Sequence, residues 1–258
     1  MNMTMARIHQ LCQMLKEHSR RIDFDNEIDW HQKHQLLKIA FPLDIHTNNA
    51  TYEIQYGHVT RPTHSNTSWD AAKYEVCAHK WADLSEKGYG VSLLNDCKYG
   101  YSTEGSTIKL TALKCASYPY PQADEGKHIF SFALLPHSGD LYDGGIIPEA
   151  YSFNQPLDTV LLDEQHGCLP DTFSLVSCDA PNVIIETVKK AEDGDDMIVR
   201  LYEAWDSRGP VTFTVNGDFK GVRLCNLMEE DMEELEFTNP SVVLPIKNFE
   251  IVTLRFVR

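Results

Sequence analysis

Short runs of alternating apolar and polar residues recur along most of the chain, and residues typical of turns separate them. Alternation with a period of two places successive side chains on opposite faces of a strand. The pattern therefore predicts an antiparallel β architecture. In the run TYEIQYG, Tyr52, Ile54 and Tyr56 are expected on one face and the residues between them on the other. Further β segments are predicted at residues 106–114, 128–137, 196–205 and 211–225.

Two features near the C-terminus predict how strands connect. Asn216-Gly217 lies between two apolar runs, and this dipeptide favours a type I′ turn, whose central positions both need positive φ. A hairpin is therefore predicted within residues 211–225. Residues 242–258 form two β-like runs broken at Lys247-Asn248, so the C-terminus is expected to close a sheet.

One segment departs from the β pattern. Within residues 7–18, Ile8, Leu11, Cys12 and Leu15 have helical spacing, which taken alone predicts a helix. The chain begins inside this structured pattern without a visible cap or linker. We therefore expect that it is truncated at its front.

Apolar density falls and turn-forming residues become frequent between Pro156 and Pro170. The part before this segment is rich in Trp, Tyr and His, whereas the part after it has plainer strands of Val, Ile and Leu. The shift predicts a larger first β-domain, residues 1–160, and a smaller second one, residues 168–258.

Composition and net charge exclude some classes of binding partner. The chain has 258 residues, of which 42% are apolar and 24% charged, as in packed globular proteins. Its net charge of −15 repels phosphate backbones and anionic lipids, so neither nucleic acid nor membrane is an expected partner. No apolar stretch approaches the roughly 20 residues that cross a bilayer, and no secretory signal is recognisable. The seven cysteines are odd in number and never spaced as Cys-x-x-Cys, which predicts reduced thiols and a cytoplasmic protein.

Candidate chemistry is sparse when it is derived from residue types alone. His31 and His34 have metal-ligand spacing, but no third ligand stands at a familiar distance along the chain, so no metal is predicted. His64 and Cys97 suggest a base and a nucleophile, yet no oxyanion-forming element accompanies them. Glycoside hydrolysis needs two carboxyl groups about 5–10 Å apart, and the sequence offers many carboxylates without pairing them.

Asp70 and Asp96 stand out among these carboxylates because aromatic and amide residues that suit sugar recognition surround both. The alternative is structural, since carboxylates in such loops often cap turns.

Long stretches of the chain resemble the C-terminal region of glycoside hydrolase family 38 α-mannosidases, in particular the cytosolic and bacterial type. The resemblance is carried by residues 20–45, 50–102, 118–140 and 182–205. It implies an all-β fold: a galactose-mutarotase-like β-supersandwich, N-terminally truncated here, followed by a smaller β-sandwich. It also implies that residues 7–18 pair as a strand, in conflict with their helical spacing.

The resemblance further implies a retaining, metal-dependent exo-mannosidase with an Asp nucleophile and a carboxylic general acid. These groups, and the ligands of its zinc or cobalt ion, belong to an N-terminal catalytic domain that precedes the matched region. No catalytic or metal-binding residue is therefore assigned to this chain. By itself it is expected to be inactive.

Loops of this region help to wall the sugar pocket in the family, and two segments match them, residues 61–70 and 95–102. The expected substrate-binding residues are Asn95, Asp96, Lys98, Tyr99, Tyr101 and Trp69. The first five could exchange hydrogen bonds with mannose hydroxyls, and the indole could stack on a sugar ring.

The resulting hypothesis is the C-terminal part of an α-mannosidase that hydrolyses terminal α-D-mannosides in glycans. The chain would act as scaffold and pocket wall, with mannose-containing glycans and the N-terminal catalytic domain as its partners. A stand-alone β-sandwich carbohydrate-binding module is the alternative. An inactive remnant of a longer reading frame is a third possibility.

Overall fold

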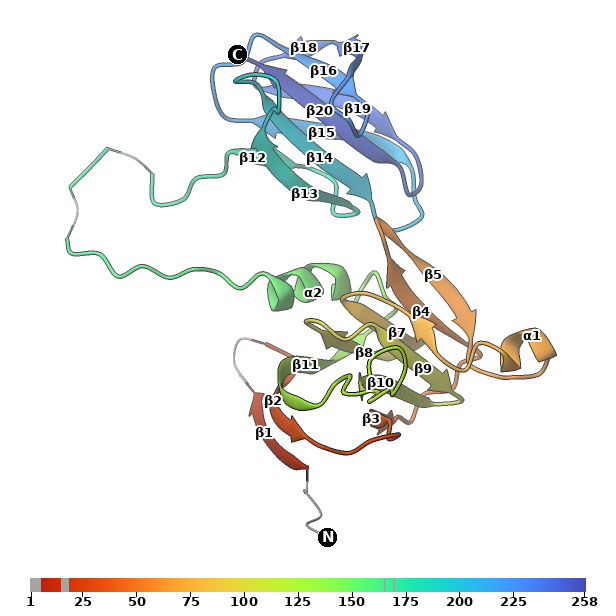
Figure 1. The fold of residues 1–258 in the computed structure, drawn as a ribbon. Coiled ribbons are helices and arrows are strands. Elements are labelled where there is room, and N and C mark those ends of the chain that lie inside the picture. Colours follow the sequence, from red (N-terminus) through yellow and green to blue (C-terminus); the bar gives the residue numbers. More distant parts are fainter. Residues whose placement is uncertain (1–5, 15–18, 165, 169) are drawn as a thin grey trace. The chain divides into compact units, whose positions relative to one another are not determined.

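The computed structural model describes residues 6–14, 19–164, 166–168 and 170–258, and the fold of these residues is all-β apart from short helices (Figure 1). The chain divides into two compact units, Met1–Thr159 and Val160–Arg258, which are described separately below. The domain bounds expected from the sequence, 1–160 and 168–258, stay a prediction.

The first unit contains two antiparallel sheets. The seven-stranded sheet has the order β1 (Arg7–Met14), β2 (Ile22–Trp30), β11 (Gly126–Ser138), β8 (Tyr89–Asn95), β7 (Trp81–Glu86), β4 (Asn49–Ile54), β5 (Gly57–Pro62). The four-stranded sheet has the order β3 (Leu37–Pro42), β10 (Thr107–Leu113), β9 (Gly100–Glu104), β6 (Val76–Cys77).

A shared core holds these two sheets together as a sandwich. Phe130 and Phe132 of β11 and Leu110 of β10 are buried in one apolar cluster. Phe24 of β2 stacks on Phe132 with the ring centroids 4.8 Å apart. The period of two along β11 and β10 brings these side chains to the inner face, as the sequence pattern predicts, although the other face of β11 is also buried from Ala133 onward.

The other face of the seven-stranded sheet is covered by α2 (Ile146–Asn154), which packs against β8 and β7. A buried polar cluster belongs to this face. The Nε2 atom of His137 lies 3.0 Å from Oδ1 of Asp83, which also accepts a 2.7 Å hydrogen bond from the Ser92 hydroxyl. A Cβ atom at position 90 would lie 2.3 Å from the His137 ring, so the buried imidazole requires Gly90.

The second unit is also a sandwich of antiparallel sheets. One sheet has the order β12 (Val176–Cys178), β15 (Gly209–Val215), β19 (Ser241–Ile246), β18 (Phe237–Thr238). The other has the order β13 (Val183–Lys190), β14 (Met197–Glu203), β20 (Ile251–Val257), β16 (Gly221–Cys225), β17 (Asp231–Leu235). Phe213 of β15 and Phe256 of β20 meet between them, with ring centroids 5.6 Å apart.

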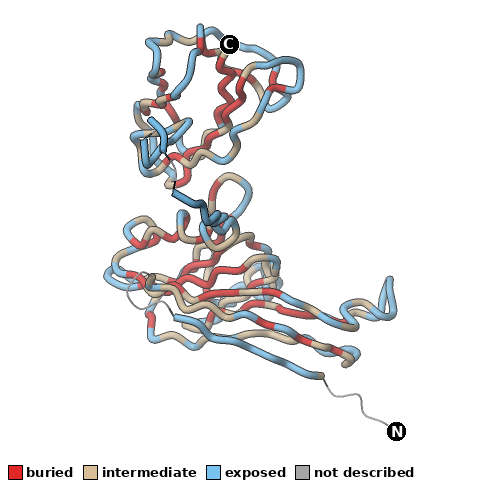
Figure 2. The backbone as a smooth tube through the Cα atoms, turned by 90° about the vertical axis from the view of Figure 1, so that its left-hand side faces the viewer, coloured by how far each residue is buried: buried red, intermediate tan, exposed pale blue. Residues whose placement is uncertain are grey.

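The N-terminal segment with helical spacing is a strand where the structure describes it. β1 pairs along its whole length with β2, from Arg7 opposite Asp29 to Met14 opposite Ile22. The helix prediction is therefore wrong for residues 7–14, and residues 15–18 lie outside the described residues. Figure 2 shows β1 exposed along its length. Hydrogen bonding to β2 outweighs the local helical pattern.

The predicted hairpin at Asn216-Gly217 is also wrong. β15 pairs with β12 and β19, whereas β16 pairs with β17 and β20, so the segment between β15 and β16 passes from one sheet to the other. The backbone N–H of Asn216 donates to the carbonyl of Leu175 at 2.8 Å, which ties the turn to another segment. Gly217 has a φ of +157°, and its Cα lies against the Phe219 ring.

The strand predicted at TYEIQYG is a strand only as far as Ile54, where β4 ends. Tyr56 has a φ of 54° and belongs to the turn before β5. Glu53, expected on the polar face, is 4% exposed, because its carboxylate accepts a 2.9 Å hydrogen bond from the Lys80 ammonium. This ion pair allows the Glu53 carboxylate to be buried, although the alternation predicts that it faces solvent.

We expect Phe213→Ala to destabilise the second unit by about 3–5 kcal/mol, because it leaves a cavity between two sheets. Urea unfolding followed by circular dichroism measures the change. Phe173→Ala is the matched control, since this ring is 71% exposed and its removal should change stability little. Equal losses in the two variants would contradict the placement of Phe213 in the core.

Candidate functional site

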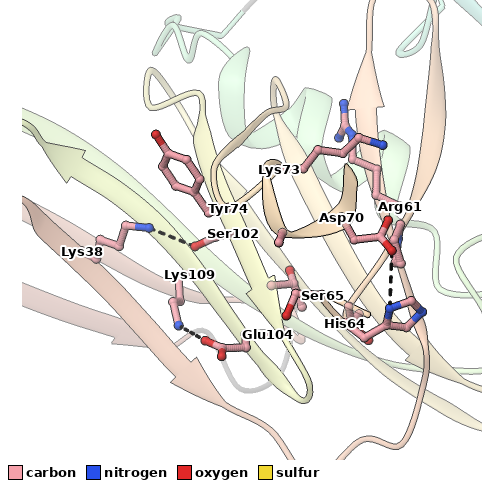
Figure 3. A pocket seen from close by; sticks show the side chains of 14 residues that line it. Lys38, Arg61, His64, Ser65, Asp70, Lys73, Tyr74, Ser102, Glu104 and Lys109 are labelled. Carbon is pink, nitrogen blue, oxygen red and sulfur yellow. Dashed lines mark hydrogen bonds and ion pairs between the residues drawn. The ribbon is translucent and has the colours of Figure 1, made fainter. Parts of the chain in front are cut away.

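A pocket of about 400 Å³ lies on the outer face of the four-stranded sheet of the first unit (Figure 3). Segment 61–74, which leaves β5 and contains α1 (Ser68–Ala71), forms its other wall. The lining residues with polar side chains include Lys38, Arg61, Thr63, His64, Ser65, Asp70, Lys73, Tyr74, Ser102, Thr103, Glu104 and Lys109. The volume is in the range of small-molecule sites.

Strand register places the sheet-side residues of this pocket. Lys109 of β10 stands opposite Ser102 of β9, and Lys38 of β3 stands opposite Thr111 of β10. Because Leu110 faces the buried core, its neighbour Lys109 must face outward. The Lys38 ammonium donates to the Ser102 hydroxyl at 3.0 Å and pairs with Glu75.

The opposite wall is shaped by a helix cap. The Thr67 hydroxyl accepts from the backbone N–H of Asp70 at 3.1 Å and donates to its carboxylate at 2.7 Å. This reciprocal arrangement stabilises the first turn of α1. Thr67 is thus the helix cap, and the Asp70 carboxylate supports it by accepting from the Thr67 hydroxyl, a structural role. The Oδ2 atom of Asp70 also lies 3.9 Å from Nδ1 of His64. Trp69 of the same turn is 80% exposed.

Two of the predicted sugar ligands are buried in loop 95–101. Asn95 donates to the carbonyl of His79 at 2.7 Å and to the Tyr101 hydroxyl, and its side-chain oxygen accepts from the backbone N–H of Lys98. Tyr101 is fully buried, and burial raises its phenol pKa, so the group stays neutral. In this structure both side chains shape the loop.

The remaining residues of that loop are more accessible. The Asp96 carboxylate accepts from the backbone N–H of Ser131 at 2.8 Å through Oδ2, while Oδ1 is buried without a hydrogen-bond partner among the described residues. The Lys98 ammonium lies 4.8 Å from the centroid of the Phe130 ring. Tyr99 is half exposed and meets the His79 ring edge-on.

The structure therefore distributes the six predicted ligands over two places. Trp69 belongs to the helical turn beside the pocket, and the other five belong to loop 95–101, whose residues do not line the pocket. The assignment of all six as mannose ligands stays a prediction.

The other candidates from the sequence also lie apart. His64 lines the pocket, whereas Cys97 belongs to loop 95–101, where burial and the Asp96 carboxylate raise its thiol pKa to about 11. His31 lies 2.8 Å from Asp29, and His34 adopts a left-handed backbone conformation rather than a helical one. Within the described ranges, no three His, Cys, Asp or Glu side chains gather in a group that could hold a metal ion.

Sequence reasoning missed the cations of the pocket. The sequence placed Arg61 and His64 in a segment matched to a pocket loop, without a role for either residue. The alternation of residues 106–114 is a signal from which an outward-facing Lys109 could have been predicted. No sequence feature places Lys38 or Lys73 in the pocket. Lys38 reaches it because β3 pairs with β10, and Lys73 reaches it because the chain returns after α1.

Two family models match the chain. "Glycosyl hydrolases family 38 C-terminal domain" covers residues 4–122, and "Glycosyl hydrolases family 38 C-terminal beta sandwich domain" covers residues 182–254. Among relatives, "Alpha-mannosidase G" of Dictyostelium discoideum is 40% identical over 93% of this chain and 22% of its own length. "Alpha-mannosidase 2C1" of Homo sapiens is 40% identical over 92% of this chain and 23% of its own length.

The fold has solved counterparts. The crystal structure of an alpha-mannosidase from Enterococcus faecalis V583 superposes with a TM-score of 0.80 and 21% identity, over 96% of this chain and 28% of that one. The chain thus spans between a fifth and a third of the length of these proteins. In the described part of the chain, no helix is long and apolar enough to cross a membrane.

We expect the Cys97 thiol, although exposed, to react slowly with iodoacetamide near pH 8, because with a pKa of about 11 only about one thiol in a thousand is ionised there. Asp96→Asn removes the neighbouring negative charge, lowers this pKa and should speed the reaction several-fold. Mass spectrometry of the Cys97 peptide measures the rate. Asp158→Asn, in an exposed carboxylate, is the control, and equal rates in both variants would contradict the effect of Asp96.

Proposed function

Because the chain belongs to glycosyl hydrolase family 38, as part of the C-terminal region of an α-mannosidase, we propose that it is the scaffold and pocket wall of an enzyme that removes terminal α-D-mannosides from glycans. The observation that carries this proposal is 40% identity to an α-mannosidase over 93% of the chain. The proposal includes a cytoplasmic location and glycans that contain mannose as substrates.

The proposed mechanism is retaining and metal-dependent. The bound zinc or cobalt ion would supply Lewis-acid chemistry. The described residues of this chain offer no grouped ligand set for it, so the proposal assigns its ligands, the nucleophile and the general acid to an N-terminal catalytic domain that is the partner of this chain.

What this chain would contribute is a rigid loop at the edge of the sugar site. The hydrogen bonds of Asn95 fix loop 95–101, together with two bonds between Asp96 and Ser131: the Asp96 backbone N–H donates to the Ser131 carbonyl, and the Ser131 backbone N–H donates to the Asp96 carboxylate. The half-exposed Tyr99 is a group that a sugar hydroxyl could engage, and the Asp96 carboxylate would do so once its buried Oδ1 atom is uncovered to the substrate. Because the loop is already ordered, its polar groups lose little conformational entropy when substrate binds.

We expect the isolated chain to show no hydrolysis of p-nitrophenyl α-mannoside with added zinc or cobalt, while it gives a cooperative β-type melt in circular dichroism. Mannosidase activity that co-purifies with the isolated chain would contradict the assignment of the catalytic groups to another domain. Saturable mannose binding by the isolated chain, measured by calorimetry, would instead favour the alternative of a stand-alone carbohydrate-binding module.

In the complete enzyme we expect Asp96→Asn and Tyr99→Phe each to lower kcat/KM for an α-mannoside by about tenfold, because each loses a hydrogen bond to substrate. Tyr118→Phe is the matched control, since Tyr118 is 87% exposed and lies outside loop 95–101. Unchanged kinetics in the first two variants would remove loop 95–101 from the sugar site.

A further inference from the structure

The pocket of the first unit collects positive charge in a chain whose net charge is −15. Four of its lining residues are Lys or Arg, and His64 adds an imidazole. Two of the cations are neutralised locally: Lys109 pairs with Glu104 at 3.1 Å, and Lys38 pairs with Glu75. The Asp70 carboxylate faces His64 and accepts a hydrogen bond from the hydroxyl of the helix cap, Thr67.

Arg61 and Lys73 are left without such a partner. Among the described residues, no carboxylate lies within 4.0 Å of either head group. The Arg61 guanidinium lies over the Tyr52 ring, 4.7 Å from its centroid, and its Nη1 atom is buried without a hydrogen-bond partner in the described part of the chain. Tyr52 itself stays neutral, because burial raises its phenol pKa. A buried donor without a partner is costly, and the positive charge of Arg61, a side chain that lines the pocket, would be compensated by an oxyanion bound there.

The arrangement suits a ligand held between two walls. Figure 3 shows Lys38 and Lys109 on the side of the sheet and Arg61, Lys73 and His64 on the side of segment 61–74. Ser65, Tyr74 and Ser102 line the same space, and Figure 3 shows the Tyr74 hydroxyl pointing away from the segment 61–74 side of the pocket. Such groups recognise the hydroxyls of a small polyol, while the cations recognise an anionic substituent.

We infer that this pocket binds a small ligand that carries a phosphate group, such as a phosphorylated monosaccharide. A phosphate monoester carries about −1.5 to −2 charges at neutral pH, which matches the two uncompensated cations. The volume of about 400 Å³ accommodates a ligand of that size. Since the site uses only residues of this chain, it is independent of the proposed mannosidase function.

Isothermal titration calorimetry of the full chain with inorganic phosphate, with a hexose 6-phosphate and with the unphosphorylated hexose tests the inference. We expect both phosphate compounds to bind and the neutral hexose not to bind. Tighter binding of the hexose phosphate than of inorganic phosphate would identify a sugar phosphate as the ligand class. Equal affinities would identify free phosphate.

Arg61→Met and Lys73→Met should each weaken phosphate binding by about tenfold, because each removes a charge-assisted contact. Lys73 is an exposed residue, so its variant keeps the test valid even if the loss of Arg61 disturbs the packing on Tyr52. Lys87→Met removes one positive charge from an exposed turn outside the pocket and serves as the matched control.

The inference is overturned if the unmodified chain gives no phosphate-dependent heat, or if the pocket variants bind phosphate as tightly as Lys87→Met does. Because no mannoside is present in this titration, either result leaves the proposed mannosidase function standing. Loss of mannosidase activity in the loop 95–101 variants would likewise say nothing about this pocket.

Discussion

The side chains of strand β11 are packed on both faces of the seven-stranded sheet, and much of the first unit depends on this constraint. Its inner face supplies Phe130 and Phe132 to the sandwich core, while its outer face includes the buried His137. Between them, the backbone N–H of Ser131 holds the Asp96 carboxylate. Because β11 pairs with both β2 and β8, the same strand joins the N-terminal hairpin to the centre of the sheet and fixes the start of loop 95–101.

Glu53 and Lys80 show how a buried carboxylate is accommodated in this unit. Glu53 accepts hydrogen bonds from both the backbone and the side chain of Lys80. Burial by itself would lower the pKa of Lys80, but the Glu53 carboxylate raises it above its ordinary value, so Lys80 stays protonated. Next to the hydrogen-bonded Asp83 and His137, glycine at position 90 leaves room for the ring. These interactions fix specific geometry rather than add much net stability.

The pocket and loop 95–101, which connects β8 to β9, show two different uses of polar residues in the first unit. In the loop, Asn95 donates hydrogen bonds to the Tyr101 hydroxyl and to a backbone carbonyl, and these bonds make the loop rigid. In the pocket, Arg61 keeps a donor unsatisfied within the described residues. Rigid loops with spare polar groups are typical of binding surfaces on β scaffolds, where strands supply the stability and loops supply the chemistry.

The sequence predicted the all-β class and the strands β10, β11 and β14, although only β10 alternates in burial along most of its length, whereas β14 is buried on both faces. It also located the loops around Trp69 and Asp96. It could not place Asn216-Gly217 correctly, because the hydrogen bond from Asn216 to Leu175 spans 41 residues and overrides the local turn preference. The local pattern alone predicted a helix at β1, whereas the family resemblance implied the strand that the structure shows for residues 7–14, because pairing with β2 stabilises the extended conformation.

The sequence by itself thus determined which segments are extended, the sign of the net charge and the family to which the chain belongs. Tertiary structure decided which strands are neighbours, which polar residues are buried with partners, and that Lys38, Arg61 and Lys73 share one pocket. The physical reason is the range of the interactions. Alternation and turn preference act over a few residues, whereas strand register and charge pairing act between segments distant in the chain.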